Sequence, residues 1–580
     1  MKRRNLCGAA LAMLCMLPIF NGGADAADVL KVVPNDALGV VVINNAGQTE
    51  AKIKRLAGQL QLPQVGVLAK LKSDLGVQKG IDDRGCFALA AIVADERTAP
   101  VAVAYVPVKD YDELLDQLNA EAAVDGISKL TLDGKPSVVA ERGGYAVVTE
   151  EANRAALAAV LSQTDSIAAG APSLNAWRAD TQAYAVATPA GVKFAQQQVL
   201  MGLAIAKAQL GQAGGQGQQA MVGIEIYEKL FKKLDKEIAY GAVGLRIEDS
   251  GDVRVVGRTL LTEGSVLAGM AADAKPGQGN VLTGLPKMPF VFAGGGVMSP
   301  AAAEPMMKAS FNMMKMYPGG KDMTEEQFRD IVALSMRSMK GMRSMGMMLG
   351  VGEGEDPLYS SMYIVIKVDD AQSYMETYLD TVREMGKVFQ GGEFPFSYEV
   401  EPMQIGGRQG IQLSMGMAGM FGQQEIPGAE KMMELMFGEG DTMEVYMAVA
   451  DDNTVMGSYV SKENLLKALA AFDNGENQLA DSPEVAKTVA SLDSDAQGIG
   501  LWSPQGTLAF VSRIASAIDP QAGAAIPQLG ETSAIGFSVK LSSDGLDTEA
   551  VIPVDVIKTV VGMIQQLMAQ RQQQAPPGAL

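Results

Sequence analysis

The chain has 580 residues, which is enough for two large domains or for three or four of ordinary size. Apolar residues make up 48% of it and charged residues 20%, so it can bury an ordinary hydrophobic core. It contains no histidine, which excludes Ser-His-Asp and Cys-His catalysis and His-ligated metal sites. Its formal net charge is −19, which argues against nucleic-acid binding, because that needs a basic surface.

The first 26 residues have the layout of a secretory signal peptide. Lys2, Arg3 and Arg4 precede an apolar stretch at 6–20, and Ala24-Asp25-Ala26 is a small-x-small cleavage site. The apolar stretch is shorter than the roughly 20 residues of a membrane span. We expect export, cleavage near Ala26, and a periplasmic or extracellular mature chain without a transmembrane span.

Cys86 is the single cysteine that such cleavage would leave. It opens an apolar run at 86–93, so we predict a buried and unreactive thiol. One thiol cannot make an internal disulfide framework, and the core must then carry the stability.

Periodicity predicts strands and amphipathic helices in mixed order over the first half, residues 27–273. Strands are expected at 38–43, 87–93, 101–106, 129–132, 137–140, 145–148 and 183–187, with a hairpin of 238–247 and 253–261. Helices are expected at 50–60, 67–75, 111–118, 150–161 and 193–210. Glycine and glutamine make 211–219 a predicted flexible stretch.

The second half, residues 284–569, repeats this order after a linker at 274–283. Strands are expected near 289–292, 362–368, 397–401, 410–414, 444–450 and 454–459, with a hairpin of 533–541 and 547–552, and helices at 371–388 and 462–472. Asp180-Thr181-Gln182, with Pro189 and Gly191 after it, recurs 315 positions later as Asp495-Ala496-Gln497 with Pro504 and Gly506. We interpret the shared order as an internal duplication, the alternative being two unrelated α+β domains.

The predicted fold class is therefore α+β, in two related halves. Each half would hold a largely antiparallel or mixed sheet with helices packed on one face, because most neighbouring strands are joined as hairpins. The tail at 570–580 is predicted to be disordered.

Two segments resemble a class of large, uncharacterised exported bacterial proteins of unknown function. They are VPNDALGVVV at 33–42, a proline–polar–acidic opening before a strand, and YVPVKDYDELL at 105–115, a strand-then-helix unit. The likeness covers mainly residues 30–150. It implies export and an α+β fold, and it brings no site residues.

Methionine is concentrated in the second half, where 27 of the 35 lie between Met288 and Met456. A capping box beginning at Thr324 predicts an amphipathic helix from Glu325 to about Met345, within a Met-rich helical segment at 301–349. The candidate binding residues are on this helix: Met336, Met339, Met342, Met345, Arg337, Lys340 and Arg343.

Three interpretations of the methionines stay open. They can fill an irregular core, form an adaptable apolar surface for an envelope protein, a peptide or a lipid, or bind Cu(I) through thioethers. Spacings compatible with Cu(I) occur at Met313-Met314-x-Met316, Met415-x-Met417 and Met432-Met433-x-x-Met436.

Recognisable catalytic motifs are missing from the sequence. It has no nucleophile elbow, phosphate-binding loop or dinucleotide fingerprint, and no acidic cluster has the spacing of a calcium loop. We therefore predict an exported, non-enzymatic binding or structural protein of the bacterial cell envelope, without a cofactor. The alternatives are a carboxylate-dependent hydrolase or lyase and a Met-rich Cu(I)-binding protein. A binding protein should show a broad groove or an exposed apolar patch, beside the methionine-rich helix.

Overall fold

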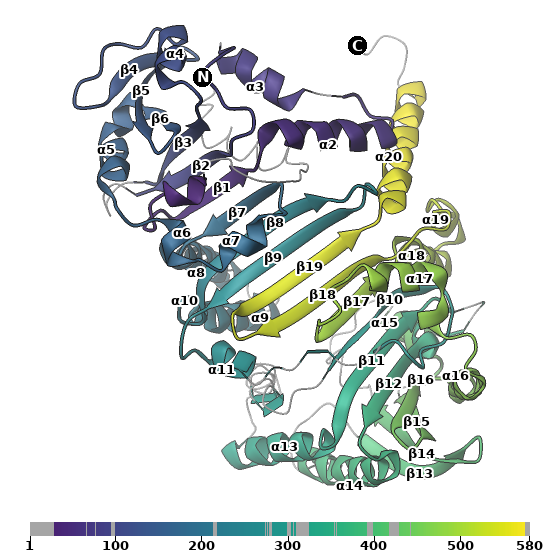
Figure 1. Cartoon of the computed structure of the whole chain (residues 1–580). Helices are drawn as coiled ribbons and strands as arrows, with labels where there is room; N and C mark the ends of the chain where they lie inside the picture. Colours follow the sequence, from purple (N-terminus) through teal and green to yellow (C-terminus); the bar gives the residue numbers. More distant parts are fainter. Residues whose placement is uncertain are drawn as a thin grey trace. The chain divides into compact units, whose positions relative to one another are not determined.

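The structure is a computed structural model (Figure 1). It describes residues 28–64, 66–75, 77–93, 99–212, 217–272, 274, 276–277, 281–297, 303–304, 307–308, 324–352, 354, 356–390, 398–416, 429–440 and 442–574. The predicted signal peptide lies outside these residues. The chain divides into two compact units. Unit 1 comprises Met1–Ala206, Glu228–Ala271 and Ser542–Ala550, and unit 2 comprises Lys207–Tyr227, Ala272–Leu541 and Val551–Leu580.

Unit 1 is built on a sheet of antiparallel strands. They are β1 (Gly39–Ile43), β2 (Phe87–Ile92), β3 (Val101–Pro107), β4 (Ser128–Leu132), β5 (Lys135–Arg142), β6 (Tyr145–Glu150), β7 (Ala183–Ala187), β8 (Ile238–Ile247), β9 (Val253–Leu261) and β19 (Gly545–Ile552). They pair in the order β4-β5-β6-β3-β2-β1-β7-β8-β9-β19, so β1 lies between β2 and the much later β7. Two ion pairs join β9 to β19, Arg254–Glu549 at 2.7 Å and Arg258–Asp547 at 2.9 Å.

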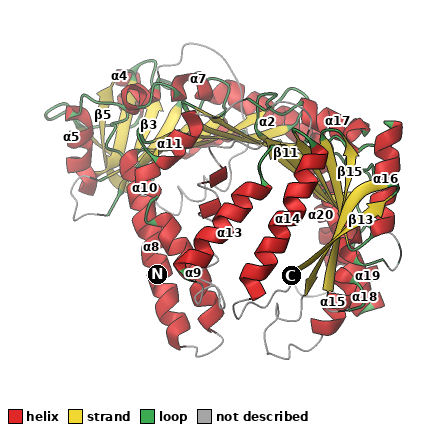
Figure 2. Ribbon diagram, turned by 90° about the horizontal axis from the view of Figure 1, so that it is seen from below, coloured by secondary structure: helices red, strands yellow, loops and turns green. Residues whose placement is uncertain are grey.

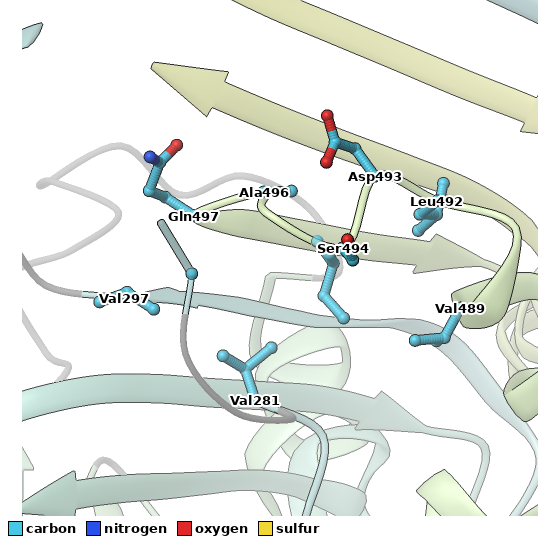
Figure 3. Close-up of a pocket in the computed structure, with 10 residues that line it drawn as sticks. Val281, Val297, Val489, Leu492, Asp493, Ser494, Ala496 and Gln497 are labelled. Atoms are coloured by element: carbon cyan, nitrogen blue, oxygen red, sulfur yellow. The ribbon is translucent and has the colours of Figure 1, made fainter. Parts of the chain in front are cut away.

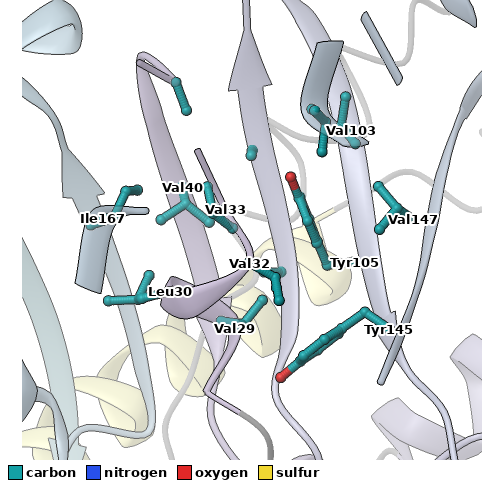
Figure 4. Close-up of a cluster of buried hydrophobic side chains, with 14 of the residues drawn as sticks. Val29, Leu30, Val32, Val33, Val40, Val103, Tyr105, Tyr145, Val147 and Ile167 are labelled. Carbon is teal, nitrogen blue, oxygen red and sulfur yellow. The ribbon is translucent and has the colours of Figure 1, made fainter. Parts of the chain in front are cut away.

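Helices of unit 1 contact the strands on both faces. The helices of residues 29–272, where the Lys207–Tyr227 stretch of α8 and α9 belongs to unit 2, are η1 (Val29–Lys31), α2 (Ala46–Gln59), α3 (Val67–Leu75), α4 (Tyr111–Gln117), η2 (Glu151–Asn153), α5 (Arg154–Ser162), α6 (Ile167–Gly170), α7 (Leu174–Arg178), α8 (Pro189–Gln212), α9 (Gly217–Phe231), α10 (Leu234–Glu237) and α11 (Val266–Ala272). Tyr105 and Val147 belong to a core that includes Leu157 of α5 and is drawn in Figure 4. Val139 and Ala146 belong to a second core, with Leu114 of α4.

Unit 2 is built on a sheet of the same kind. Its strands are β10 (Phe290–Val297), β11 (Met342–Gly350), β12 (Met362–Val368), β13 (Tyr398–Ile405), β14 (Arg408–Gly416), β15 (Thr442–Asp451), β16 (Thr454–Tyr459), β17 (Gly498–Trp502) and β18 (Ile535–Ser542). They pair in the order β13-β14-β15-β16-β12-β11-β10-β17-β18, all antiparallel. β10 therefore lies between β11 and the much later β17.

Helices also lie on both faces of the unit 2 sheet. They are α13 (Glu325–Ser338), η4 (Leu358–Ser361), α14 (Ala371–Gln390), α15 (Ala429–Phe437), α16 (Lys462–Asn474), η5 (Leu479–Asp481), α17 (Pro483–Ala490), α18 (Pro504–Ile518), α19 (Pro520–Ala524) and α20 (Val554–Gln574). On β15, Met447 packs in a core with Met375 of α14, whereas the next residue, Ala448, packs in a core with Leu465 of α16. Figure 2 shows α13 and α14 side by side, and Met336 of α13 and Met385 of α14 both pack against a core of Ile331 and Val332.

The α+β class and the antiparallel pairing of the strands are confirmed, but the prediction of helices on one face only is wrong. The physical reason is that successive strand residues, which point to opposite faces, are both apolar, so each face needs a cover. Two local predictions also need correction. α8 extends to Gln212 and α9 begins at Gly217, so most of the stretch predicted to be flexible is helical, and α20 continues to Gln574 in the predicted tail. Residues 213–216 and 575–580 lie outside the described residues.

No helix in the described part of the chain is both long enough and apolar enough to cross a membrane.

Candidate functional site

The structure does not place the seven candidate binding residues on one helix, so the prediction of a helix to Met345 is wrong. Helix α13 begins at the predicted capping box but ends at Ser338. Met336 and Arg337 lie on this helix, Met339 and Lys340 in the turn after it, and Met342, Arg343 and Met345 on strand β11.

Two glycines suit the change from helix to strand. Gly341 has a φ of +81°, which side-chain-bearing residues rarely adopt and which turns the chain out of the helix. Gly346 lies so close to the backbone carbonyl of Val281 that a Cβ there would clash with it. The methionines at every third position imitate a helical period, but pairing of β11 with both β10 and β12 outweighs that local pattern.

The two arginines among these residues have partners at the surface. The Arg337 guanidinium lies 3.0 Å from Glu384 of α14, and Arg343 Nε lies 2.6 Å from an oxygen of Asp369. Met336 is partly buried, whereas Met345 is 36% exposed. The predicted basic and methionine-lined surface on one helix is therefore divided between a helix face and a strand.

Of the methionine groups with spacings suited to Cu(I), Met313, Met314, Met316 and Met417 lie outside the described residues. Within the described ranges, no cluster of three or more cysteine or acidic side chains could hold a metal ion. The thioether hypothesis stays a prediction.

An exposed apolar surface lies on one face of the unit 2 sheet, over β10, β11, β17 and β18. We call it the apolar sheet face and define it by five side chains that are 36–44% exposed, namely Phe292, Met345, Trp502, Phe537 and Val539. Their opposite-facing neighbours on the same strands, such as Ala293, Met348 and Leu501, are fully buried. Large apolar side chains exposed together on adjacent strands mark interaction surfaces more often than isolated ones do.

Strand register brings these side chains together. Phe292 is paired with Trp502 across β10 and β17, and residues paired across antiparallel strands project to the same face. The neighbouring rows run from Phe537 through Gly500 and Gly294 to Met347, and from Val539 through Gly498 and Gly296 to Met345. Four glycines therefore form the middle of this surface, with large apolar side chains around them.

A separate pocket of about 270 Å³ lies in unit 2, where the chain enters β17 (Figure 3). Val281, Val297 and Val489 lie on one side of it, with Asp493 and Gln497 on the other. We call it the Asp493 pocket. Its lining is Gly277, Val281, Val297, Val489, Leu492, Asp493, Ser494, Ala496, Gln497 and Ile499.

The polar groups at this pocket are engaged with strand β18. Lys540 Nζ lies 3.1 Å from carboxylate oxygens of both Asp493 and Asp495. Burial opposes the charged form of Lys540, but the hydrogen bonds to the two aspartates hold its pKa above the ordinary value. The Gln497 side chain accepts a hydrogen bond from the Leu541 N–H at 2.7 Å and donates one to the Leu541 carbonyl at 3.0 Å. The two carboxylates and one ammonium carry one net negative charge.

Unit 1 contains a cluster of large and charged side chains after α7. Arg178 forms an ion pair with Asp28, and both side chains are more than four-fifths buried. Trp177 packs edge-on against Tyr184 with ring centroids 6.2 Å apart. Asn44 donates hydrogen bonds to the carbonyls of Arg178 and Thr181. Nearby, Cys86 is buried as predicted, donates a hydrogen bond to the side-chain Oδ1 of Asn44 at 3.3 Å, and has a pKa raised by burial.

Sequence reasoning missed both the apolar sheet face and the Asp493 pocket. The face joins strands that are about 200 residues apart in the chain, and only the register brings them together. A partial signal was present in the alternation Gly498-Ile499-Gly500-Leu501-Trp502, in which every second residue lacks a side chain or is aromatic. The pocket had no signal, because its walls come from three separate segments.

No family model, no curated protein and no solved structure matches this chain.

Proposed function

We propose that this chain is an exported, non-enzymatic binding protein of the bacterial cell envelope, and that the apolar sheet face is where its partner docks. The observation that carries the proposal is the group of exposed aromatic and aliphatic side chains on adjacent strands, which includes the Phe292–Trp502 pair. Aromatic side chains dominate the energetics of protein interfaces, and a partner that covered them would remove a large apolar area from water.

The chemistry of this surface favours an apolar partner, which can be an envelope protein, a peptide or a lipid. The five defining side chains carry no charge, and the four glycines between them let a partner approach the backbone closely. Met345 belongs to this surface. It is the one residue that this surface shares with the adaptable methionine-containing binding site proposed from the sequence. Methionine is flexible and suits a surface that accepts partners of varied shape.

We also propose that the chain consists of two related halves. The pairing order supports this, because β2-β1-β7-β8 in the first half corresponds to β11-β10-β17-β18 in the second. β3 and β6 extend the first set where β12 and β16 extend the second.

Side-chain hydrogen bonds at equivalent positions support the same relation. The Gln182 side chain accepts a bond from the Ile247 N–H at 2.6 Å, and Gln497, 315 residues later, accepts one from Leu541 at 2.7 Å. Both glutamines follow an aspartate by two residues and stand immediately before a strand, β7 in one case and β17 in the other.

Two further correspondences come from helix caps and a short motif. The Thr188 and Ser503 hydroxyls accept bonds from the N–H groups of Gly191 and Gly506, at 3.2 and 3.0 Å, and in each case a proline begins the helix. The sequence VLKVVP at 29–34 recurs as VLTGLP at 281–286. The residue before the proline accepts a backbone bond in both copies, from Ile167 to Val33 at 3.1 Å and from Leu479 to Leu285 at 2.8 Å.

Substitution of Phe292 and Trp502 by serine tests the docking proposal. The immobilised protein would be exposed to a detergent-solubilised envelope fraction and, separately, to lipid vesicles. We expect the double variant to lose at least about tenfold in retained partner or vesicle, since two aromatic anchors of the surface are removed.

The matched control is Val243→Ser, which changes a 51% exposed strand residue of unit 1 and should leave capture unchanged. Both variants should melt within a few degrees of the parent, because the altered side chains are already partly in water. Equal capture by a folded double variant and by the parent would refute the proposal.

A further inference from the structure

We propose that the Asp493 pocket binds a cationic group carried on a short apolar stem, such as an alkylammonium or the side chain of a lysine residue. The stem would lie among the aliphatic side chains of the pocket, and the cation at its rim beside Asp493 and Asp495. This site is distinct from the apolar sheet face: Ile499 lines the pocket, whereas Gly498 and Gly500, on either side of it, belong to the rows of the face.

Comparison of the two halves explains why a cavity exists here, and this step rests on their proposed relation. Gln182 and Gln497 set a spacing of 315 residues between equivalent positions. At that spacing Tyr184 corresponds to Ile499, and Trp177 corresponds to Leu492. Unit 1 thus has two packed aromatic rings where unit 2 has smaller aliphatic side chains around an open pocket.

The charge at this place is also inverted between the halves. Arg178 of unit 1 corresponds to Asp493 of unit 2. Unit 1 supplies its own guanidinium and pairs it with Asp28 in a buried setting. Unit 2 supplies carboxylates instead, and among the described residues the ion pairs of Lys540 neutralise one of the two charges of Asp493 and Asp495. A cation from outside would complete the charge balance.

The volume of the pocket and the polarity of its lining further limit which ligands can bind. A volume of about 270 Å³ is at the lower end of small-molecule pockets, which suits one long side chain or a short amine. Five aliphatic side chains line the pocket and favour a methylene stem, namely Val281, Val297, Val489, Leu492 and Ile499. Gln497 already uses both ends of its amide on Leu541, so specificity would come from the charge at the rim.

The test compares pentylamine, pentanol and pentanoate, which share a stem and differ in charge, with the whole protein by saturation-transfer NMR. We expect pentylamine to bind about fivefold more tightly than pentanol, as for a partly exposed ion pair, and pentanoate to bind most weakly. A capped Gly-Lys-Gly peptide forms a fourth arm. Binding of the peptide as tight as that of pentylamine would assign a polypeptide side chain, and binding of the amine alone would assign a small free amine.

Two variants make the test decisive. Ile499→Tyr introduces the side chain of unit 1 and should abolish binding of every probe, whereas Ile518→Tyr, at a position 62% exposed on α18, should not. Asp493→Asn should remove the preference for the amine and keep the binding of pentanol, even if the tyrosine variant fails to fold.

The proposal is overturned if pentanol or pentanoate binds as tightly as pentylamine, if Asp493→Asn leaves the preference intact, or if no probe binds. None of these results affects the test of partner docking through Phe292 and Trp502. The proposal for the Asp493 pocket can therefore be refuted without refuting the proposal for the apolar sheet face.

Discussion

Individual glutamines hold the turns before β7 and β17 in place by bonding to the backbone of the following strand of the sheet. Gln182 is fully buried, and its amide serves both the Ile247 N–H and the Asp180 carbonyl. The sequence revealed the recurrence of this residue at Gln497 but not its role. That role depends on a strand that arrives about 60 residues later, and short-range patterns carry no information about such a partner.

Gln182→Leu tests this role. Leucine would fill the space but leave the buried Ile247 N–H without its partner, and we expect a loss of about 1–3 kcal/mol in the free energy of unfolding. Guanidinium unfolding measures the change. Gln197→Leu, at an exposed position of α8, is the control, with an expected change within about 0.5 kcal/mol. Equal effects of the two substitutions would show that the amide bond stabilises nothing.

At the scale of elements, strands and helices bounded by turn residues were predictable, and the α13–β11 segment was not. Strands β7, β8, β9, β12 and β16 were predicted at their observed bounds, because each is an apolar run between turn signals. The Met-rich segment follows a period close to that of a helix up to Met345. Its second part forms a strand because two neighbouring strands pair with it, and a local pattern cannot reveal that.

The start of α14 gives a pH-dependent prediction. The Asp370 carboxylate accepts a hydrogen bond from the Ser373 N–H at 2.7 Å, and this bond holds the pKa of Asp370 below its ordinary value. A lowered pKa in the folded protein means that the carboxylate stabilises the fold at pH values above the unfolded pKa, about 3.9. This contribution disappears as the pH falls through the folded pKa.

We therefore expect Asp370→Ala to lower the melting temperature at pH 7 and to have a smaller effect near pH 2. Calorimetry of the variant and its parent at both pH values measures the difference. Asp380→Ala, in the middle of α14 and 3.9 Å from Arg383, should have little effect at either pH. An Asp370 effect that stays constant or grows in acid would contradict the assignment of this capping bond.

At the scale of the whole chain, the α+β class followed from the order of apolar runs, and the proposed duplication followed from their repetition. The candidate sites did not follow. Val281 and Leu492 line one pocket although they are more than 200 residues apart, and Phe292 meets Trp502 only through the pairing of β10 with β17. Surfaces of this kind depend on topology, whereas the sequence signals used here act over a few residues.

Site-directed photocrosslinking most directly tests whether the chain works by contact through its apolar sheet face. A benzophenone amino acid would replace Phe537, which is 38% exposed on β18, and in a second protein it would replace Tyr227, which is 56% exposed on α9. After irradiation in the native envelope fraction, we predict that position 537 gives a defined protein or lipid adduct and that position 227 gives none. Adducts formed at 227 as readily as at 537, or no adduct at 537, would contradict this account of the protein.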